Sequence, residues 1–600
     1  MLGIAIKNEF LDLPPGTRLE SEKINGFLEF NSQLSGEYSM PLECRLTATN
    51  MRLLEFAGLI QTKVNNKGID CAVYDAHNQV SVGKLKIESP KHNLNSANRG
   101  TISLYYLTGS AGFFQDIKDV KMYSADFGGA RSFAWDNYAM AGPGFWSHIH
   151  AVINGDVNAF DYAFYPVVNK AWTENVGGTQ ITNEVMNNMV YSGGQVQFVK
   201  KATDNIELNV IVPFPYLHYV MKQVVAHVGW TIAGGILDDP DFKSITMINM
   251  QAIDWGFMSP QQAAHEIIFG PSATPGTHAA TIQFDLADHM PDMSISEFLL
   301  AVKNRFGWWY SFDNQTKTIT IHELQNVVAS TIKDLTRYAS PLIPKKVAQT
   351  AKIYSLKNEF VGEYAGGKPE LKNVKYQGPV DLIADLPAPS LALADHTYLV
   401  RAENNFYICR PVPGATDDTY SWQFYAYNVY DVEPDGATES VTTKATCLGS
   451  EKYSAYLDLV PRIDMAGNWN RYSYNGTTWG IHLMMYKGKK NNKAAQPVPF
   501  ATSGIYDSNG NVVANWSLAF ECQLFDGTQV GLYHEKWEKM LQAISNPETF
   551  EFSLALPLAE YEQLKFSDTI IIDGVKMYLT KTKPVIPYND ELMVEAIRIY

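Results

Sequence analysis

Dipeptides of the Asn-Gly and Asp-Gly type punctuate the chain, and they constrain its fold more than any other feature. Such pairs favour tight two-residue β-turns, because both turn positions need a positive φ that Asn, Asp and Gly tolerate. The clearest example, Asp573-Gly574, separates the β-branched run 569–572 from the apolar run 575–579. The pattern predicts a chain built largely from β-hairpins, with further candidate turns at Asn25-Gly26, Asn154-Gly155, Asp435-Gly436, Asn475-Gly476, Asn509-Gly510 and Asp526-Gly527.

Strand-like runs gather at both ends of the chain. Residues 84–87 and 102–107 near the N-terminus, and 552–556 and 592–599 near the C-terminus, have the apolar patterning of strands. Neither end looks complete as a domain by itself. Since an unpaired sheet edge is a site of aggregation, we expect the C-terminal strands to complete a sheet that begins at the N-terminus.

Helices are expected at three places between the strands. Apolar residues recur at helical spacing over 217–228, after Pro215. A capping box, Ser294-Ile295-Ser296-Glu297, opens a second helix that ends before Gly307. Strand, turn and strand follow over 308–321. A third helix is expected near 533–544.

Length and composition set the fold class. Six hundred residues exceed the size at which one hydrophobic core keeps growing, so we expect about three to five modules. Aromatic residues make up 12% of the chain and favour strands. We therefore predict a mainly β, multidomain fold of β-barrel or β-sandwich domains, with small α/β modules of helix, strand and strand between them.

Charge and cysteine content narrow the choice of partners. A net charge of −15 opposes binding to a phosphate backbone, which depends on clustered Lys and Arg. No apolar stretch reaches the length of a transmembrane helix. The five scattered cysteines form no CxxC pair, which predicts reduced core thiols. We expect no nucleic-acid specificity, no transmembrane segment and no cofactor.

Candidate metal ligands are few. In a strand, His148 and His150 would share a face and both reach a metal ion, but no third ligand is indicated and we favour ordinary histidines. The His-Glu pairs at 265, 322 and 534 lack the second histidine of a metalloprotease helix. The cluster Asp238-Asp239-Pro240-Asp241 lacks the spacing of an EF-hand and is interpreted as a solvated turn. No metal site is predicted.

Signatures of catalysis are also missing. The chain contains no GxSxG elbow, P-loop or GxGxxG, and Gly142-Pro143-Gly144 with Phe145-Trp146-Ser147 is interpreted as a loop. We therefore predict no catalytic residue and no enzymatic activity. Paired glycosidase carboxylates stay open, because the fold brings them together and leaves little spacing signal.

Aromatic residues are dense between 420 and 480. An exposed row of aromatics would stack against sugar rings, whereas a buried row would pack one face of a strand into a β-sandwich. We favour packing, and keep four residues as candidate glycan-binding aromatics: Trp422, Tyr425, Tyr427 and Trp479.

Four short stretches, spread over most of the chain, carry a family resemblance. They are Ser39–Glu43 running into Asn50–Gly58, Asp288–Met293 before the capping box, Gly531–Trp537, and the terminal hairpin Ile572–Leu579. Together they resemble the tail-hub and tail-tip proteins of tailed bacteriophages, which are baseplate-hub-like, and particularly those of Bacteroidetes-type hosts.

The resemblance implies a structural virion protein that closes the distal end of a phage tail tube. It implies a homo-oligomeric ring, with a trimer favoured, whose tube-like β domains sit beneath a six-fold tail tube. Its partners would be the tail tube protein above and spike, fibre or other tail-tip proteins, and assembly would take place in the host bacterial cytoplasm.

The chain is accordingly divided as follows. An N-terminal tube-like β domain, 1–135, is completed by a C-terminal β unit, 546–600. Between them lie a Gly- and aromatic-rich insertion, 136–210, α/β modules, 211–335, and a β-rich aromatic domain, 336–545, with the helix near 533–544. The alternative functions are a carbohydrate-binding receptor-recognition protein of the tail tip or, less favoured, a hydrolase of cell-wall or capsule glycans.

Overall fold

The computed structural model describes most of the chain. The described residues are 1–26, 30, 37–56, 68–91, 100–134, 142–169, 173–176, 179–182, 185–198, 210–253, 281–327, 332–340, 345–347, 351–359, 361, 375–401, 405–412, 419–425, 431–432, 434–453, 458–463, 468–470, 473–475, 479–507, 509, 511–522, 528–546, 548–589 and 591–598.

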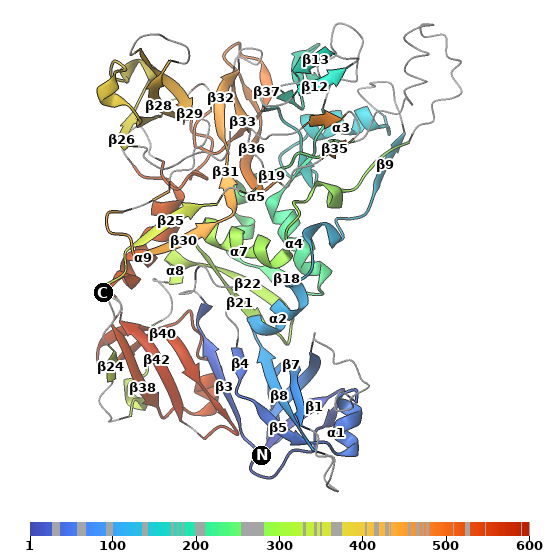
Figure 1. Cartoon of the computed structure of the whole chain (residues 1–600), viewed down its shortest axis with the longest axis vertical. Helices are drawn as coiled ribbons and strands as arrows, with labels where there is room; N and C mark the ends of the chain where they lie inside the picture. The colour runs from blue at the N-terminus through green and yellow to red at the C-terminus, as the bar shows by residue number, and fades with distance from the viewer. Residues whose placement is uncertain are drawn as a thin grey trace.

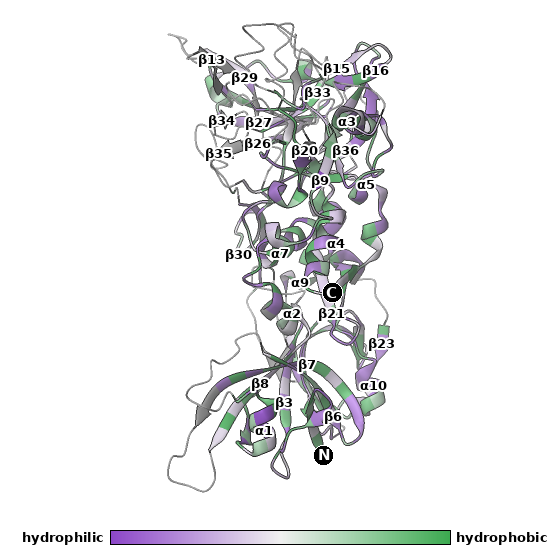
Figure 2. Cartoon of the chain, turned by 90° about the vertical axis from the view of Figure 1, so that its right-hand side faces the viewer, coloured by the Kyte–Doolittle hydropathy of each residue, from purple (hydrophilic) through white to green (hydrophobic). Residues whose placement is uncertain are grey.

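The fold is mainly β and multidomain, which confirms the predicted class. One large sheet lies at the end of the molecule that carries the N-terminus, and helices and smaller sheets rise from it (Figure 1). We call this sheet with its attached helices the base. The described residues of 110–327 and 351–546 are called the body. In the side view, the strands of the base curve to both sides below a narrower middle (Figure 2).

The base contains strands from both ends of the chain in a single 15-stranded sheet. Its central path runs β2-β1-β6-β7-β8-β4-β3-β40-β42-β38-β24. The N-terminal strands are β1 (Leu2–Ile6), β2 (Glu9–Phe10), β3 (Leu19–Ile24), β4 (Glu37–Ser39), β5 (Leu42–Arg45), β6 (Ile69–Asp75), β7 (Asn78–Lys91) and β8 (Thr101–Thr108). The others are β23 (Ile332–Asp334), β24 (Lys345–Val347), β38 (Thr549–Leu554), β39 (Thr569–Ile572), β40 (Val575–Lys583), β41 (Val585–Ile586) and β42 (Leu592–Arg598).

Two separate hydrophobic clusters support the base. The N-terminal cluster is formed by inward residues of β1 and β5–β8 and by helix α1 (Ala48–Leu53). The C-terminal cluster is formed by β38–β40 and β42, with Leu335 and residues beside helix α10 (Leu558–Glu562). The base is therefore one sheet by hydrogen bonding and two units by packing.

The body holds several smaller sheets. Its strands are β9 (Arg131–Ala134) with β20 (Thr281–Phe284); β10 (Tyr162–Ala163) with β17 (Phe214–Pro215); β14 (Val185–Met186), β11 (Val167–Val168), β33 (Asp458–Arg462) and β32 (Gly449–Tyr453); and β13 (Thr179–Thr182), β12 (Thr173–Val176), β34 (Asn468–Asn470) and β35 (Ser473–Asn475). They continue with β15 (Met189–Ser192) and β16 (Gln195–Phe198); β18 (Thr231–Ala233), β22 (Thr318–Glu323) and β21 (Trp308–Asp313); β19 (Ile245–Ile248), β36 (Ile481–Asn491), β31 (Ala445–Cys447) and β37 (Pro497–Thr502); β25 (Tyr354–Asn358) with β30 (Glu439–Thr443); and β26 (Lys375–Val380), β27 (His396–Val400), β28 (Asn405–Pro411) and β29 (Tyr420–Tyr425).

One large hydrophobic cluster fills most of the body and reaches the base at Tyr578 and Ile597, beside a small separate cluster of Val168, Val185 and Val460. Its helices are α2 (Ser110–Ile117), α3 (Phe145–Asn154), α4 (Leu217–His227), α5 (Pro240–Lys243), α7 (Ile295–Phe306), α8 (Leu324–Val327) and α9 (Glu538–Ser545), the last preceded by a π-helical turn, η9 (Tyr533–Trp537). The capping box of α7 is confirmed: Ser294 and Glu297 each satisfy the other's backbone N–H. Gly307 then ends the helix in the left-handed region, where an added Cβ would meet the carbonyl oxygen of Lys536.

The expectation of a loop before Ser147, and of a strand at the two histidines that follow, was wrong. Residues from Phe145 onward form the helix α3, which Asn154-Gly155 ends without making a hairpin turn. Trp146, Ile149 and Ile153 recur at helical spacing and are fully buried, so burial of this stripe selects the helix.

The histidines of α3 therefore do not share a face as strand residues would. His148 Nε2 lies 2.5 Å from the hydroxyl of Tyr162, and burial, together with the nearby Arg131 charge, lowers the pKa of His148 to about 4. His150 is buried on the helix as well. The contact of His148 with Tyr162 agrees with the favoured interpretation of a hydrogen-bonded histidine.

The acidic cluster before α5 is also different from the expected solvated turn. Asp239 caps α5 by accepting hydrogen bonds from the backbone N–H groups of Asp241 and Phe242. Asp241 is only 5% exposed. The five cysteines, by contrast, are free and buried as predicted.

Candidate functional site

The N-terminal and C-terminal strands of the base meet along one antiparallel ladder, which we call the seam. It consists of residues 19–24 of β3 and residues 581–586 of β40 and β41. Leu19 pairs with Ile586 at one end, and Ile24 pairs with Lys581 at the other. Burial alternates at the start of β3, with Leu19 and Ser21 buried and Glu20 exposed, so one face of the strand points into the protein. Its backbone pairs with β4 as well as with β40 and β41.

Asn25 anchors the end of the seam. This residue is 1% exposed, and its side-chain amide donates to the carbonyl oxygens of Leu579, at 2.6 Å, and Phe566, at 3.3 Å. Its backbone N–H donates to Thr580 O at 2.8 Å. Because a buried carbonyl without a donor costs about 1–3 kcal/mol, Asn25 ties the N-terminal unit to the C-terminal unit. The sequence marks Asn25-Gly26 as a turn, which hides this role.

Charged groups flank the same ladder. Lys581 Nζ lies 2.9 Å from Glu22 Oε1, and Lys583 reaches the other oxygen of Glu22 at 3.9 Å. At the opposite end, the backbone N–H of Tyr588 donates to Asp75 Oδ2 at 2.9 Å. These contacts add polar links between the two units without joining their hydrophobic clusters.

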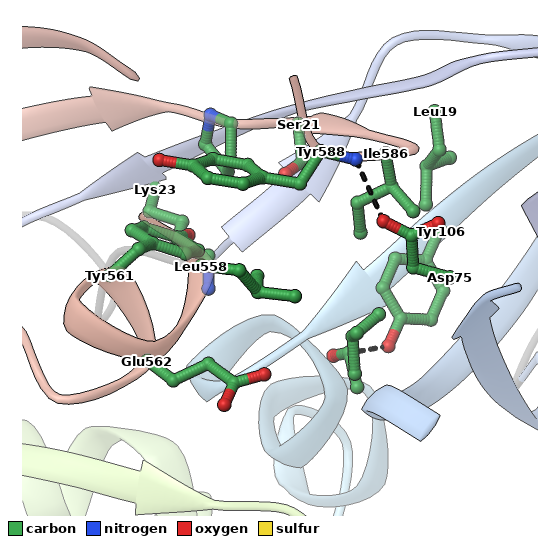
Figure 3. Close-up of a pocket in the computed structure, with 13 residues that line it drawn as sticks. Leu19, Ser21, Lys23, Asp75, Tyr106, Leu558, Tyr561, Glu562, Ile586 and Tyr588 are labelled. Carbon is green, nitrogen blue, oxygen red and sulfur yellow. Dashed lines mark hydrogen bonds between the residues drawn. The ribbon is translucent and has the colours of Figure 1, made fainter. Parts of the chain in front are cut away.

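A small cavity opens beside the seam (Figure 3). The rings of Tyr561 and Tyr588 stack there with centroids 5.3 Å apart, and Lys23 Nζ lies 5.4 Å from the Tyr561 centroid. Across the cavity, the Tyr106 hydroxyl donates to Ser81 Oγ at 2.6 Å. The enclosed space is about 40 Å³, which suits a few water molecules and not a sugar ring. The seam therefore joins the two units by hydrogen bonds and, at one end, by apolar packing of Ile586 against the N-terminal cluster that contains Leu19.

The four aromatic residues selected from the sequence fall in different places. Trp422 is half-buried in β29, where its indole N–H donates to Pro387 O at 2.7 Å and its ring meets Tyr398 edge-on at 5.3 Å. Trp479 packs against the large body cluster. Tyr425 ends β29, and Tyr427 lies outside the described residues. The structure does not assemble these residues into one described surface, and glycan binding by them stays a prediction.

Within the described ranges, no group of three or more His, Cys, Asp or Glu residues is placed to hold a metal ion. Among the described helices, none is long and apolar enough to cross a membrane. Asp241 and Lys487 form a buried ion pair in the body.

Comparison with known proteins gives little support from sequence. No family model matches the chain, and no curated protein matches it significantly. Among solved structures, the chain is similar to the 43 kDa tail protein of prophage MuSo2 from Shewanella oneidensis. The match covers 100% of this chain and 98% of that chain, with 7% identity and a TM-score of 0.29. At this TM-score the likeness carries no functional conclusion.

Proposed function

We propose that the protein is a structural component of a bacteriophage tail, a hub or tip piece that closes the distal end of the tail tube as a homo-oligomeric ring. The single observation that carries the proposal is the base, in which both ends of the chain share one sheet over two packed units. The segments that resemble tail-hub proteins lie partly in this base. A role in the virion, without enzymatic activity, follows from the same proposal.

The stoichiometry follows from the two units. If each chain contributes two β units to a ring, a trimer presents six units, which matches a six-fold tail tube. The tail tube protein would bind one side of this ring, and spike, fibre or other tail-tip proteins would bind the body. The predicted division of the chain, with 1–135 completed by 546–600, belongs to this proposal, as do a Bacteroidetes-type host and assembly in the host cytoplasm.

Oligomeric state tests the proposal directly. Mass photometry of the purified chain and cryo-EM of phage particles should both reveal a closed ring, with a trimer expected. Asn25→Ala should weaken ring formation, because it loosens the two units that the ring must present together. Arg52→Ala is the matched control, since Arg52 pairs with Glu9 at the surface of the same unit and both are more than half exposed. A stable monomer in isolation and in particles would contradict the proposal.

A further inference from the structure

Lys487 and Asp241 form a deeply buried Lys–carboxylate contact in the body. Lys487 Nζ lies 2.5 Å from Asp241 Oδ1, and the two side chains are 9% and 7% exposed. They come from β36 and α5, which are 246 residues apart in sequence. A second link between the same elements is the hydrogen bond from the Tyr486 N–H to Ser244 O, at 2.8 Å.

The two oxygens of Asp241 are held differently. Oδ1 faces the amine of Lys487, whereas Oδ2 accepts a hydrogen bond from the backbone N–H of Asn515 at 2.7 Å. A backbone N–H aimed at one carboxyl oxygen is the arrangement that stabilises a developing oxyanion. Oδ1 of Asp241 thus faces the nitrogen of Lys487, and Oδ2 faces a fixed backbone donor.

The surroundings make loss of a proton from Lys487 easier. Burial lowers the pKa of Lys487, against the opposing effect of the Asp241 carboxylate. Burying a full ion pair is expensive, so transfer of the proton from Nζ to Oδ1 within the pair relieves part of that cost. The Asp239 carboxylate also acts electrostatically on Lys487 and, like that of Asp241, raises the pKa of Lys487 against the effect of burial.

We propose that Lys487 and Asp241 condense to an intramolecular amide that cross-links β36 to α5. The neutral Nζ attacks Cγ of Asp241, and Oδ2, held by Asn515, carries the negative charge of the tetrahedral intermediate. Oδ1 then leaves as water, taking its own proton and one from the amine. One C–N bond forms, one C–O bond breaks and one water is released, so no oxidant, reductant or further reactant is needed.

The cross-link would close a loop that holds much of the body. Closing a long loop removes conformational entropy from the unfolded chain, and the gain grows with loop length. A covalent tie between α5 and β36 would also keep the body closed under a pulling force. This inference concerns the body alone and does not depend on the proposed ring.

Mass spectrometry tests the cross-link. The intact mass of the denatured full-length chain should be lower than the sequence mass by one water, and proteolysis should yield a branched peptide that joins the segments around 241 and 487. Lys487→Arg keeps a cation beside Asp241 but should restore the full sequence mass.

A matched control uses a comparable ion pair. Lys536 Nζ lies 2.5 Å from Glu323 Oε1, but Glu323 is 19% exposed, and Lys536→Arg should leave the water loss and the branched peptide unchanged. A wild-type chain with its full sequence mass and two linear peptides would overturn the proposal and leave a buried ion pair only. The mass of the wild-type chain is sufficient to test the cross-link, so the conclusion does not depend on whether the variants fold.

Discussion

The base and the body are held together by different forces. Most of the body is filled by one large apolar cluster, so its parts cohere by burial of large side chains. The base has two clusters, and its halves are joined at the seam by a backbone ladder, by Asn25, by flanking ion pairs and by packing of Ile586 against the N-terminal cluster. Loss of an apolar side chain should therefore damage the body most, whereas loss of a single amide should damage the base.

Removal of a core aromatic should give the largest effect. Trp308 is fully buried and stacks on Phe306, with ring centroids 4.9 Å apart. Trp308→Ala should lower the free energy of unfolding of the body by about 3–5 kcal/mol, because it leaves a cavity. Urea denaturation followed by hydrogen exchange measures this and assigns it to a region. Phe10→Ala, at a side chain that is 52% exposed in the base, is the control and should change stability little.

Acidification should have the second-largest effect, and it should destabilise the body more than the base. Burial lowers the pKa of His482 to about 4 and that of His289 to about 3, both in the body. In the unfolded chain the pKa of a histidine is about 6.5, so between this value and the lower pKa of the folded state the unfolded chain binds more protons. The stability of the folded state is therefore full above about pH 6.5 and falls as the pH drops towards 4.

The loss at His482 should be on the order of 3 kcal/mol. Thermal unfolding between pH 7 and pH 4 measures it, and His482→Gln, which keeps a partner for Thr446, should flatten the profile. A base that loses protection before the body on acidification would contradict the comparison.

Removal of the Asn25 side-chain amide should destabilise the seam. Asn25→Ala leaves the buried carbonyl oxygens of Leu579 and Phe566 without their donor, and should cost about 1–3 kcal/mol. Hydrogen exchange should rise over 19–24 and 581–586 while protection of the body stays unchanged. Equal loss of protection in both regions would show that base and body unfold as one unit.

A surface cap in the body should give the smallest effect. Ser294→Ala removes the side chain that accepts the Glu297 N–H at the start of α7, and should cost about 1 kcal/mol. Hydrogen exchange of the α7 backbone, measured by mass spectrometry, reports this change. Ser294→Asp, which retains an N-cap acceptor, should restore most of it.

Local signals in the sequence predicted local structure well. The Asp573-Gly574 turn joins β39 to β40, and the strands after α7 pair antiparallel as β21 and β22. The capping box and the buried cysteines are confirmed too. In each case the chemistry lies within a few neighbouring residues, so tertiary contacts reinforce it.

The predictions that failed concern residues whose structure depends on contacts with residues far away in the sequence. The stripe of α3 was missed because its Gly-rich lead-in favours a loop, and only burial in the body cluster selects the helix. Asp241 was interpreted as solvated because Lys487, its partner, is 246 residues away. The role of Asn25 was missed for the same reason, because the carbonyl groups that it binds lie near the other end of the chain.

The sequence by itself determined a mainly β chain with its hairpin turns, a capped helix and reduced thiols, because turn geometry, capping and residue polarity act over short distances. Only the tertiary structure decided that β3 pairs with β40 and β41 where the two ends of the chain meet, that an amide locks this seam and that a lysine lies against an aspartate inside the body. Those contacts join residues hundreds of positions apart, and their partners become defined only when the chain has folded.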